Sequence, residues 1–228
     1  NGRDDDGNGY VDDVHGWDFV DGDNTPQDGF YHGTFVSGII GAVGNNALGV
    51  SGINWQVSIL PVRFQGDSGM GYTGAAVSAL NYVTQLKREG IPIVATNISW
   101  GGVLGMPTTV DTAIRAEVAA GITVVAAGND GSDTDLVPRY PSSFTSDGMI
   151  TVAATDSSDN LAGFSNYGAT SIDVGAPGVG ILSTLPGGGY GSISGTSFAA
   201  PQVTGMVALL ASVRPNASVA EIRSAILG

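Results

Sequence analysis

Three short apolar runs constrain the fold of this 228-residue chain more than any other feature of its sequence. Residues 57–64, 91–99 and 122–127 are rich in aliphatic and β-branched side chains, without alternation of polar and apolar positions. Strands of this kind are buried on both faces, as they are in a parallel sheet covered by helices. We therefore expect a layer of parallel strands in the middle of the molecule.

The segments between these runs have helical spacing. Apolar positions recur every three or four residues, in one segment that Thr73 can cap and in another that Gly121 can end. These positions are Ala76, Leu80, Val83, Val110, Ile114 and Val118. Further helices are predicted over residues 34–43, 196–212 and 219–227, and further strands over residues 150–154 and 171–174.

Strands that alternate with helices in this way predict an α/β fold, with a mostly parallel central sheet and helices on both faces. No repeat and no Pro/Ser-rich linker divides the sequence, so we expect one domain over residues 1–228. Ligand sites in such folds lie at the carboxyl ends of the strands. The motifs at those positions therefore carry the functional prediction.

The charge of the chain excludes some partners. The net charge is −13, and nine of the eighteen Asp residues fall in residues 1–28 beside a single Arg. Because so few basic side chains are available to displace counterions, we expect no nucleic-acid partner. No apolar run approaches the ~20 residues that a membrane span needs, so we expect no membrane partner either. The absence of Cys excludes a disulfide framework.

Three motifs at predicted strand ends and helix starts bring together the groups of a nucleophilic catalyst. Taken singly, each is a turn or a helix cap. A serine hydroxyl is a weak nucleophile until a base removes its proton, and His32 and Ser197 are candidates for base and nucleophile. The side-chain amide of Asn129 and the backbone N–H of Ser197 would donate to the oxyanion that forms.

The order of these motifs resembles that of the subtilisin-like serine peptidases, or subtilases, and is closest in pattern to the thermitase branch. The motifs are His32-Gly33-Thr34, Ser99-Trp100-Gly101-Gly102, Gly128-Asn129 and Gly195-Thr196-Ser197, with further matches at residues 164–168 and 173–178. The resemblance implies a three-layer subtilisin-like fold and a secreted, extracellular serine endopeptidase that acts on polypeptides through an acyl-enzyme. It gives His32 the role of general base, Ser197 that of nucleophile and Asn129 that of oxyanion donor.

The resemblance also implies where a peptide substrate binds. Two extended segments would pair with its backbone, namely Ser99, Trp100 and Gly101 on one side and Ser68, Gly69 and Met70 on the other. The primary specificity pocket would be lined by Ala126, Ala127 and Gly128. Such small residues leave room for a large apolar side chain, so we expect broad specificity that leans toward apolar residues.

One catalytic residue of the family has no counterpart in this sequence. The family's catalytic Asp follows a buried strand upstream of the His, whereas every Asp before His32 lies in a loop rich in Gly and Asn. We therefore expect a chain truncated at both ends, without its N-terminal strand, and a separate N-terminal piece that carries this Asp. The alternative is an impaired or inactive subtilase that binds calcium or protein. An esterase with a nucleophile elbow is disfavoured, because residues 195–199 lack the last Gly of G-x-S-x-G.

Residues 1–28 are predicted to form a calcium-loop segment. Residues 4–12 fit the first nine positions of an EF-hand-like loop, D-x-D-x-N-G-x-V-D, whose alternative is a solvated acidic loop. The candidate ligands there are Asp4, Asp6, Asn8, the Tyr10 carbonyl and Asp12. Residues 18–27 resemble a thermitase-type calcium site, with Asp18, Asp21, Asp23, Thr25 and Gln27 as candidate ligands. We expect calcium to be the cofactor, and hypothesise that the second ion fixes the loop before His32.

Overall fold

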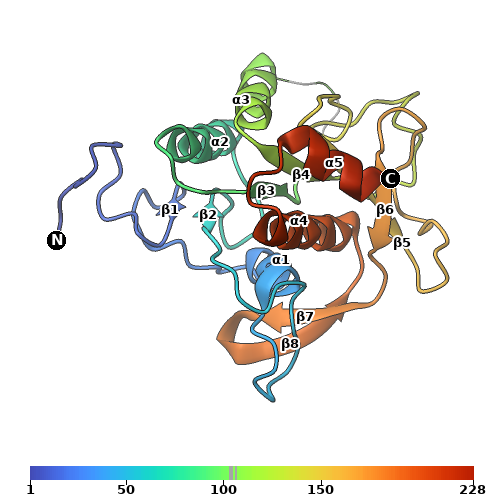
Figure 1. Ribbon diagram of the computed structural model, residues 1–228, viewed down its shortest axis with the longest axis horizontal. Helices are drawn as coiled ribbons and strands as arrows, with labels where there is room; N and C mark the ends of the chain where they lie inside the picture. The colour runs from blue at the N-terminus through green and yellow to red at the C-terminus, as the bar shows by residue number, and fades with distance from the viewer. Residues whose placement is uncertain (103–104, 106) are drawn as a thin grey trace.

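The computed structural model describes residues 1–102, 105 and 107–228. Its helices are α1 (His32–Gly41), α2 (Thr73–Arg88), α3 (Thr108–Ala119), α4 (Thr196–Val213) and α5 (Val219–Leu227), with a short 3-10 turn at Pro186–Gly188. Its strands are β1 (Trp17–Asp18), β2 (Val62–Arg63), β3 (Ala95–Ile98), β4 (Ile122–Ala126), β5 (Met149–Thr155), β6 (Val174–Pro177), β7 (Ile181–Leu185) and β8 (Gly189–Ile193). Figure 1 shows these elements along the chain.

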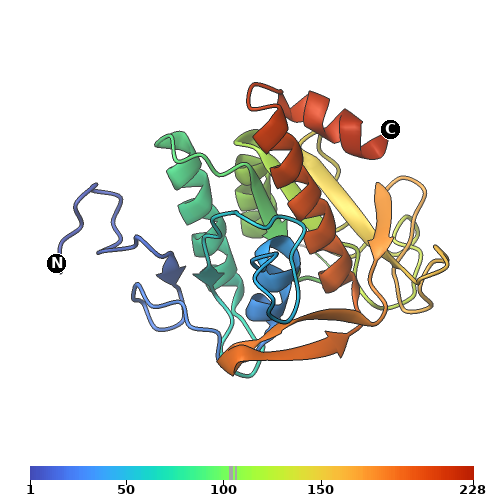
Figure 2. The same ribbon diagram turned by 60° about the horizontal axis from the view of Figure 1, so that its bottom comes forward.

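A four-stranded parallel sheet, in the order β3-β4-β5-β6, lies between two helical layers (Figure 2). Every residue of β4 is buried, because its alternate side chains enter two different cores. Val124 packs with residues of α4 such as Val203, whereas Val125 packs with residues of α3 such as Ile114. The prediction of an α/β fold with helices on both faces of a mostly parallel sheet is confirmed.

Helix α4 is the central helix of one layer. It is long and apolar enough to cross a membrane by length and composition, and half of it is buried inside the protein. It contacts all four strands of the sheet as well as α1 and α5. The apolar side chains of α4 therefore form the core beneath the sheet, and its first residues lie at the carboxyl ends of the strands.

Several predicted boundaries were wrong. Residues 57–64 and 91–99 form only the short strands β2 and β3, and residues 171–173 precede the strand β6 instead of forming one. Thr73 is the first residue of α2 and not its cap, because the chain turns at Tyr72, whose backbone is extended. Helix α1 begins two residues before the predicted start at residue 34. The hairpin β7–β8 was not predicted, since its strands mix Gly with polar and apolar residues.

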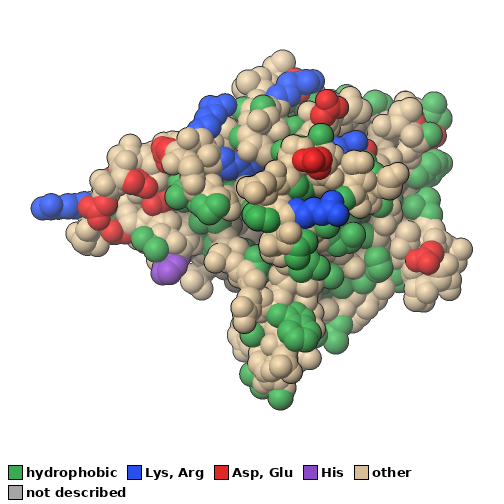
Figure 3. Space-filling model, viewed as in Figure 1, with side chains coloured by type: hydrophobic (Ala, Val, Ile, Leu, Met, Phe, Trp, Pro, Cys, Tyr) green, Lys and Arg blue, Asp and Glu red, His purple; other side chains and the backbone are tan. Residues whose placement is uncertain are grey.

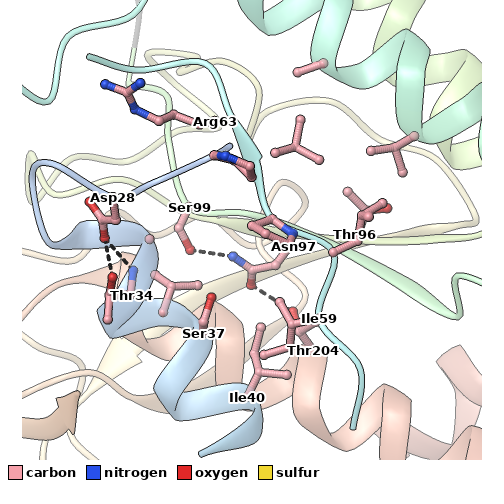
Figure 4. A pocket seen from close by; sticks show the side chains of 18 of the residues that line it. Asp28, Thr34, Ser37, Ile40, Ile59, Arg63, Thr96, Asn97, Ser99 and Thr204 are labelled. Carbon is pink, nitrogen blue, oxygen red and sulfur yellow. Dashed lines mark hydrogen bonds between the residues drawn. The ribbon is translucent and has the colours of Figure 1, made fainter. Parts of the chain in front are cut away.

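The shortness of β2 and β3 has a structural cause. Within the described residues, β2 pairs only with β1 and β3 pairs only with β4, so each has one edge without a partner. A cavity of about 930 Å³ lies between them, lined by residues 57–66 and 91–100 and by helices α1 and α2 (Figure 4). Ile59 and Val94, which were predicted to be buried, are exposed here. The sheet is therefore interrupted between β2 and β3.

A buried ion pair ties the layer of α2 and α3 to the sheet. Glu117 on α3 is completely buried and pairs with Lys87 on α2, whose side chain is 4% exposed. The same carboxylate accepts hydrogen bonds from Thr84 Oγ1 at 2.9 Å and from Thr96 Oγ1 on β3. These contacts satisfy a carboxylate that would otherwise be strongly destabilising in the core.

We predict that Lys87→Met lowers the free energy of unfolding by about 3–5 kcal/mol, because it leaves Glu117 charged and buried without its cation. Urea-induced unfolding measures the loss. The control is Asp111→Asn, which breaks the exposed pair with Arg115 on the same helix layer and is expected to cost less than ~1 kcal/mol. Equal losses of unfolding free energy in the two variants would contradict a stabilising role of the buried pair between Lys87 and Glu117.

Candidate active site

Thr196 joins the carboxyl end of β4 to the start of α4. Its backbone N–H and its Oγ1 both donate to Asn129 Oδ1, at 2.9 and 3.0 Å. The Gly128 N–H in turn donates to Thr196 Oγ1 at 3.1 Å. Because these two donors occupy Oδ1 of Asn129, its Nδ2 is the end of the amide that remains to bind another group. Thr196 is completely buried, whereas Asn129 is exposed, so the junction reaches from the core to the surface.

Ser197 is fixed to the end of β3 by two reciprocal hydrogen bonds. Its Oγ donates to the Ser99 carbonyl at 3.1 Å, and Ser99 Oγ donates to the Ser197 carbonyl at 2.9 Å. Asn97 Nδ2 donates to Ser99 Oγ at 2.8 Å, and Thr204 Oγ1 donates to Asn97 Oδ1 at 2.8 Å (Figure 4). The N–H of Ser197 belongs to the first turn of α4, where N–H groups have no acceptor within the helix. Ser197 therefore presents a positioned hydroxyl together with a backbone N–H that has no acceptor within the helix.

His32 is the first residue of α1 and lies against the start of α4. Its ring centroid is 5.5 Å from that of Phe198, the residue after Ser197. Burial lowers the pKa of His32, and the nearby Asp28 carboxylate opposes this shift. The imidazole is therefore neutral at neutral pH, which is the form that accepts a proton. The three predicted catalytic residues thus come from α1, from the segment after β4 and from α4, and they lie around one helix start.

Asp28 belongs to this site although the sequence reasoning did not select it. Its Oδ1 accepts the N–H groups of Phe30 at 3.0 Å and Tyr31 at 2.8 Å. Its Oδ2 accepts the N–H of Thr34 at 2.6 Å and Thr34 Oγ1 at 2.7 Å (Figure 4). An Asp shortly before a helix start is a common signal for such contacts and points to this role.

An aromatic contact joins one of the two segments predicted to hold a peptide to the residue that precedes the hairpin of the other. The rings of Phe64 and Trp100 meet edge to face with centroids 5.3 Å apart. After Phe64, residues 65–71 form a tight hairpin in which the Gly66 N–H donates to the Met70 carbonyl at 2.9 Å. Asp67 and Ser68 form its turn, which the Gly69 N–H closes onto the Gly66 carbonyl at 2.9 Å, and the Met70 side chain is 75% exposed. Ser99 and Gly101 flank Trp100, so both segments border the same region.

The residues predicted to line the specificity pocket lie at the end of β4. Ala126 and Ala127 are buried, and the Ala127 carbonyl accepts Asn166 Nδ2 at 3.0 Å. Gly128 has φ +102°, and a Cβ added there would lie 2.4 Å from Asn166 Nδ2. Only glycine suits that backbone and that close approach. Asn166 therefore holds the segment that leads to Asn129.

The first predicted calcium loop is held by its own hydrogen bonds. The Asp4 carboxylate accepts the N–H groups of Gly7 and Gly9, each at 2.8 Å, and Asp6 accepts the N–H and the side-chain amide of Asn8. Asp12 binds the amino group of Asn1 at 2.8 Å, and Tyr10 packs against Trp17. Figure 3 shows acidic side chains gathered on this arm of the molecule. The oxygen atoms of this loop fit calcium in kind, although here they accept hydrogen bonds from the N–H groups of the same segment.

The second predicted calcium cluster is neutralised by an arginine. The Arg63 guanidinium on β2 binds Asp18, which is 1% exposed, and also Asp21 at 2.8 Å. Asp23 accepts the N–H and Oγ1 of Thr25, whose carbonyl accepts the Gln27 N–H. Because the cation paired with Asp18 and Asp21 is Arg63, this donor set does not fit a calcium ion in the observed arrangement. In the described part of the chain, no three His, Cys, Asp or Glu side chains converge as a metal site.

Known proteins resemble this chain over most of its length. Residues 1–228 match the profile described as the subtilase family. Thermitase of Thermoactinomyces vulgaris is 41% identical over 213 residues, which cover 93% of this chain and 72% of thermitase. The thermophilic serine proteinase of Bacillus sp. (strain AK1) is 41% identical over 213 residues, covering 93% of this chain and 50% of that protein. The crystal structure of a cold adapted subtilisin-like serine proteinase matches with TM-score 0.80 and 34% identity, covering 92% of this chain and 71% of that one.

We predict that His32 titrates below the ordinary histidine value of about 6.5, because burial penalises its charged form. The chain has two His residues, so two imidazole cross-peaks followed by NMR against pH give the midpoint, and His15→Gln assigns them. As pH falls below about 6.5 the unfolded chain takes up this proton first, so this residue's contribution to stability declines with acidification. A His32 midpoint at or above 6.5 would contradict the prediction.

Proposed function

The chain belongs to the subtilase family, and on that premise we propose that it provides the nucleophile and base of a serine endopeptidase that acts through an acyl-enzyme. The observation that carries this proposal is the convergence of Ser197, Asn129 and His32 around the first turn of α4. We also propose that the protein is secreted, because calcium loops of modest affinity bind their ion in the calcium-rich medium outside cells.

The residues divide the chemistry between them. Ser197 Oγ attacks the carbonyl carbon of the peptide bond, and His32 accepts its proton and later gives it to the leaving amine. For this step the Ser197 hydroxyl must turn from the Ser99 carbonyl, which it meets at 3.1 Å, toward His32. Asn129 Nδ2 and the Ser197 N–H donate to the oxyanion. The oriented amide of Asn129 supports this role, since Thr196 already holds its Oδ1.

Substrate binding is proposed at the segments around Ser99–Gly101 and Ser68–Met70. Extended peptide would pair by its backbone with both, a mode that demands little of the peptide's sequence. Small residues 126–128 at the end of β4 support a preference for apolar side chains before the cleaved bond. The exposed Met70 adds apolar surface on the opposite side.

The carboxylate that would orient His32 is proposed to come from a further segment. Asp28 is an unsuitable source, because both its oxygens already accept hydrogen bonds from residues 30–34. The cavity between β2 and β3 suits a parallel, mainly apolar strand, which would bond to the edge of each. Parallel strands end on the same side of a sheet, and His32 and Ser99 line that cavity. An Asp at the end of the added strand would therefore lie near the imidazole.

We predict that a fluorophosphonate labels Ser197 slowly in the isolated chain, and faster when a peptide that fills this cavity is added. The peptide carries about six apolar β-branched residues followed by Asp, with terminal Lys for solubility. The expected gain is large, because a histidine without its carboxylate partner loses about 10⁴-fold in rate. Mass spectrometry of the labelled protein gives the rates and identifies the modified residue.

Two controls separate binding from chemistry. The same peptide with Asn in place of Asp is expected to raise the melting temperature equally but to leave labelling slow. Asn129→Ala is expected to lower the labelling rate by about 100- to 1000-fold in the presence of the Asp peptide. Labelling absent in every case would refute the peptidase proposal and favour the alternative, an inactive subtilase module that binds calcium or protein.

We also propose that the first loop binds calcium through Asp4, Asp6, Asn8, Asp12 and the Tyr10 carbonyl, whereas the arginine-paired second cluster does not. Calcium at about 100 times its dissociation constant would stabilise the fold by about 2.7 kcal/mol. The melting temperature with calcium and with a chelator measures this effect, and Asp6→Asn is expected to reduce it. A melting temperature that calcium does not change would overturn the proposal, and Asp21→Asn serves as the matched control.

A further inference from the structure

The Asp28 carboxylate holds the chain on both sides of His32. One oxygen bonds to the N–H groups of Phe30 and Tyr31, before the histidine, and the other bonds to Thr34, after it. The four distances lie between 2.6 and 3.0 Å. The same carboxylate lies near Gly33, where an added Cβ would be 3.6 Å from Oδ2. A single side chain therefore fixes the backbone of the whole segment that carries His32.

The backbone at this point needs such support. Tyr31, directly before His32, has φ +142° and ψ −24°, a conformation that residues with a side chain rarely adopt. Strained backbone of this kind persists only where surrounding contacts enforce it. Helix α1 has no side-chain cap at its first position, so the Thr34 N–H, an orphan donor of the first turn, is satisfied by Asp28 instead.

We propose that Asp28 is a positioning residue for His32, which sets the place of the imidazole by fixing residues 30–34, an assignment that rests on the proposed role of His32 as base. It acts through the backbone and not by bonding the ring, since its four hydrogen bonds already engage both oxygens. Its negative charge also faces the positive end of the α1 dipole, where His32 begins the helix.

Two aromatic rings pack against His32 among the described residues. Its ring packs against Phe198 of α4 at 5.5 Å and against Tyr31 at 6.4 Å between centroids. Asp67 lies beside Gly29 of the same loop, but its carboxylate is bound by Arg63 at 2.8 Å. Among the described residues, Asp28 is the charged group that shifts the pKa of His32, and it shifts it upward.

The test compares Asp28→Ala, Asp28→Asn and the matched control Asp67→Asn, which removes one charge from the neighbouring 65–71 hairpin, beside Gly29, without removing a hydrogen bond to residues 30–34. Three measurements are made on each: the NMR titration of His32, the Ser197 labelling rate with the Asp peptide, and the melting temperature. In both Asp28 variants we expect the His32 midpoint to move to lower pH, because the negative charge is lost. Asp28→Ala is expected to label roughly 10- to 100-fold more slowly, as displacement of about 1 Å costs in other enzymes.

The conservative variant separates positioning from folding. Asp28→Asn keeps one acceptor oxygen, so it is expected to recover part of the labelling rate while its His32 midpoint stays low. Asp67→Asn is expected to match the parent chain in both readouts. The proposal is overturned if Asp28→Asn titrates and labels like the parent, or if Asp67→Asn changes both as much. If no form labels, the proposed function fails, whereas the titrations still decide the role of Asp28.

Discussion

The hydrogen bonds of Thr196 are the contact on which the site depends. They lock the first turn of α4 to the end of β4, and the rest of α4 is held under the sheet by residues such as Val203 and Val207. The proposed nucleophile and the proposed oxyanion donor are therefore placed by one junction, with Ser197 on the helix and Asn129 in the segment that follows β4. Ser197 lies on the helix itself, and the Thr196 hydrogen bonds hold Asn129 to the same helix start, as accurate catalytic geometry requires.

The sequence correctly predicted those elements of the fold whose signal lies within a short stretch of chain. Strand β4 and helix α4 were predicted correctly, because complete burial and helical spacing are visible within a few residues. The lengths of β2 and β3 were predicted wrongly, since a strand extends only as far as both its edges find partners. The motifs that carry the site prediction are likewise short stretches of chain. Arg63, which neutralises Asp18 and Asp21, lies far from them along the chain and gave no signal.

The acidic residues illustrate a general ambiguity. Asp in a loop rich in Gly and Asn serves equally well to bind a cation or to accept backbone N–H groups, and the spacing is similar for both. Asp4 accepts the N–H groups of its own loop, and Asp28 does the same around His32. Asp135 is a further case, because hydrogen bonds from Ser171 and Thr170 lower its pKa to about 2. Many of these carboxylates thus stabilise loops, and their charge alone does not identify a metal site.

The interruption of the sheet affects the orientation of His32 more than its position. Helix α1 is held from below by the hairpin β7–β8, where Ser183 Oγ donates to the Phe35 carbonyl at 2.7 Å and Thr184 Oγ1 to the Thr34 carbonyl at 2.9 Å. Phe35 also packs against Phe198 of α4. Thr34 and Thr184 line the cavity between β2 and β3, whereas Phe35, Ser183 and Phe198 are buried. The buried contacts of Phe35 therefore hold α1 whether or not a strand fills the cavity. A carboxylate supplied there would then act on the tautomer and the charge of an imidazole that the rest of the fold already holds against Phe198, the residue after Ser197.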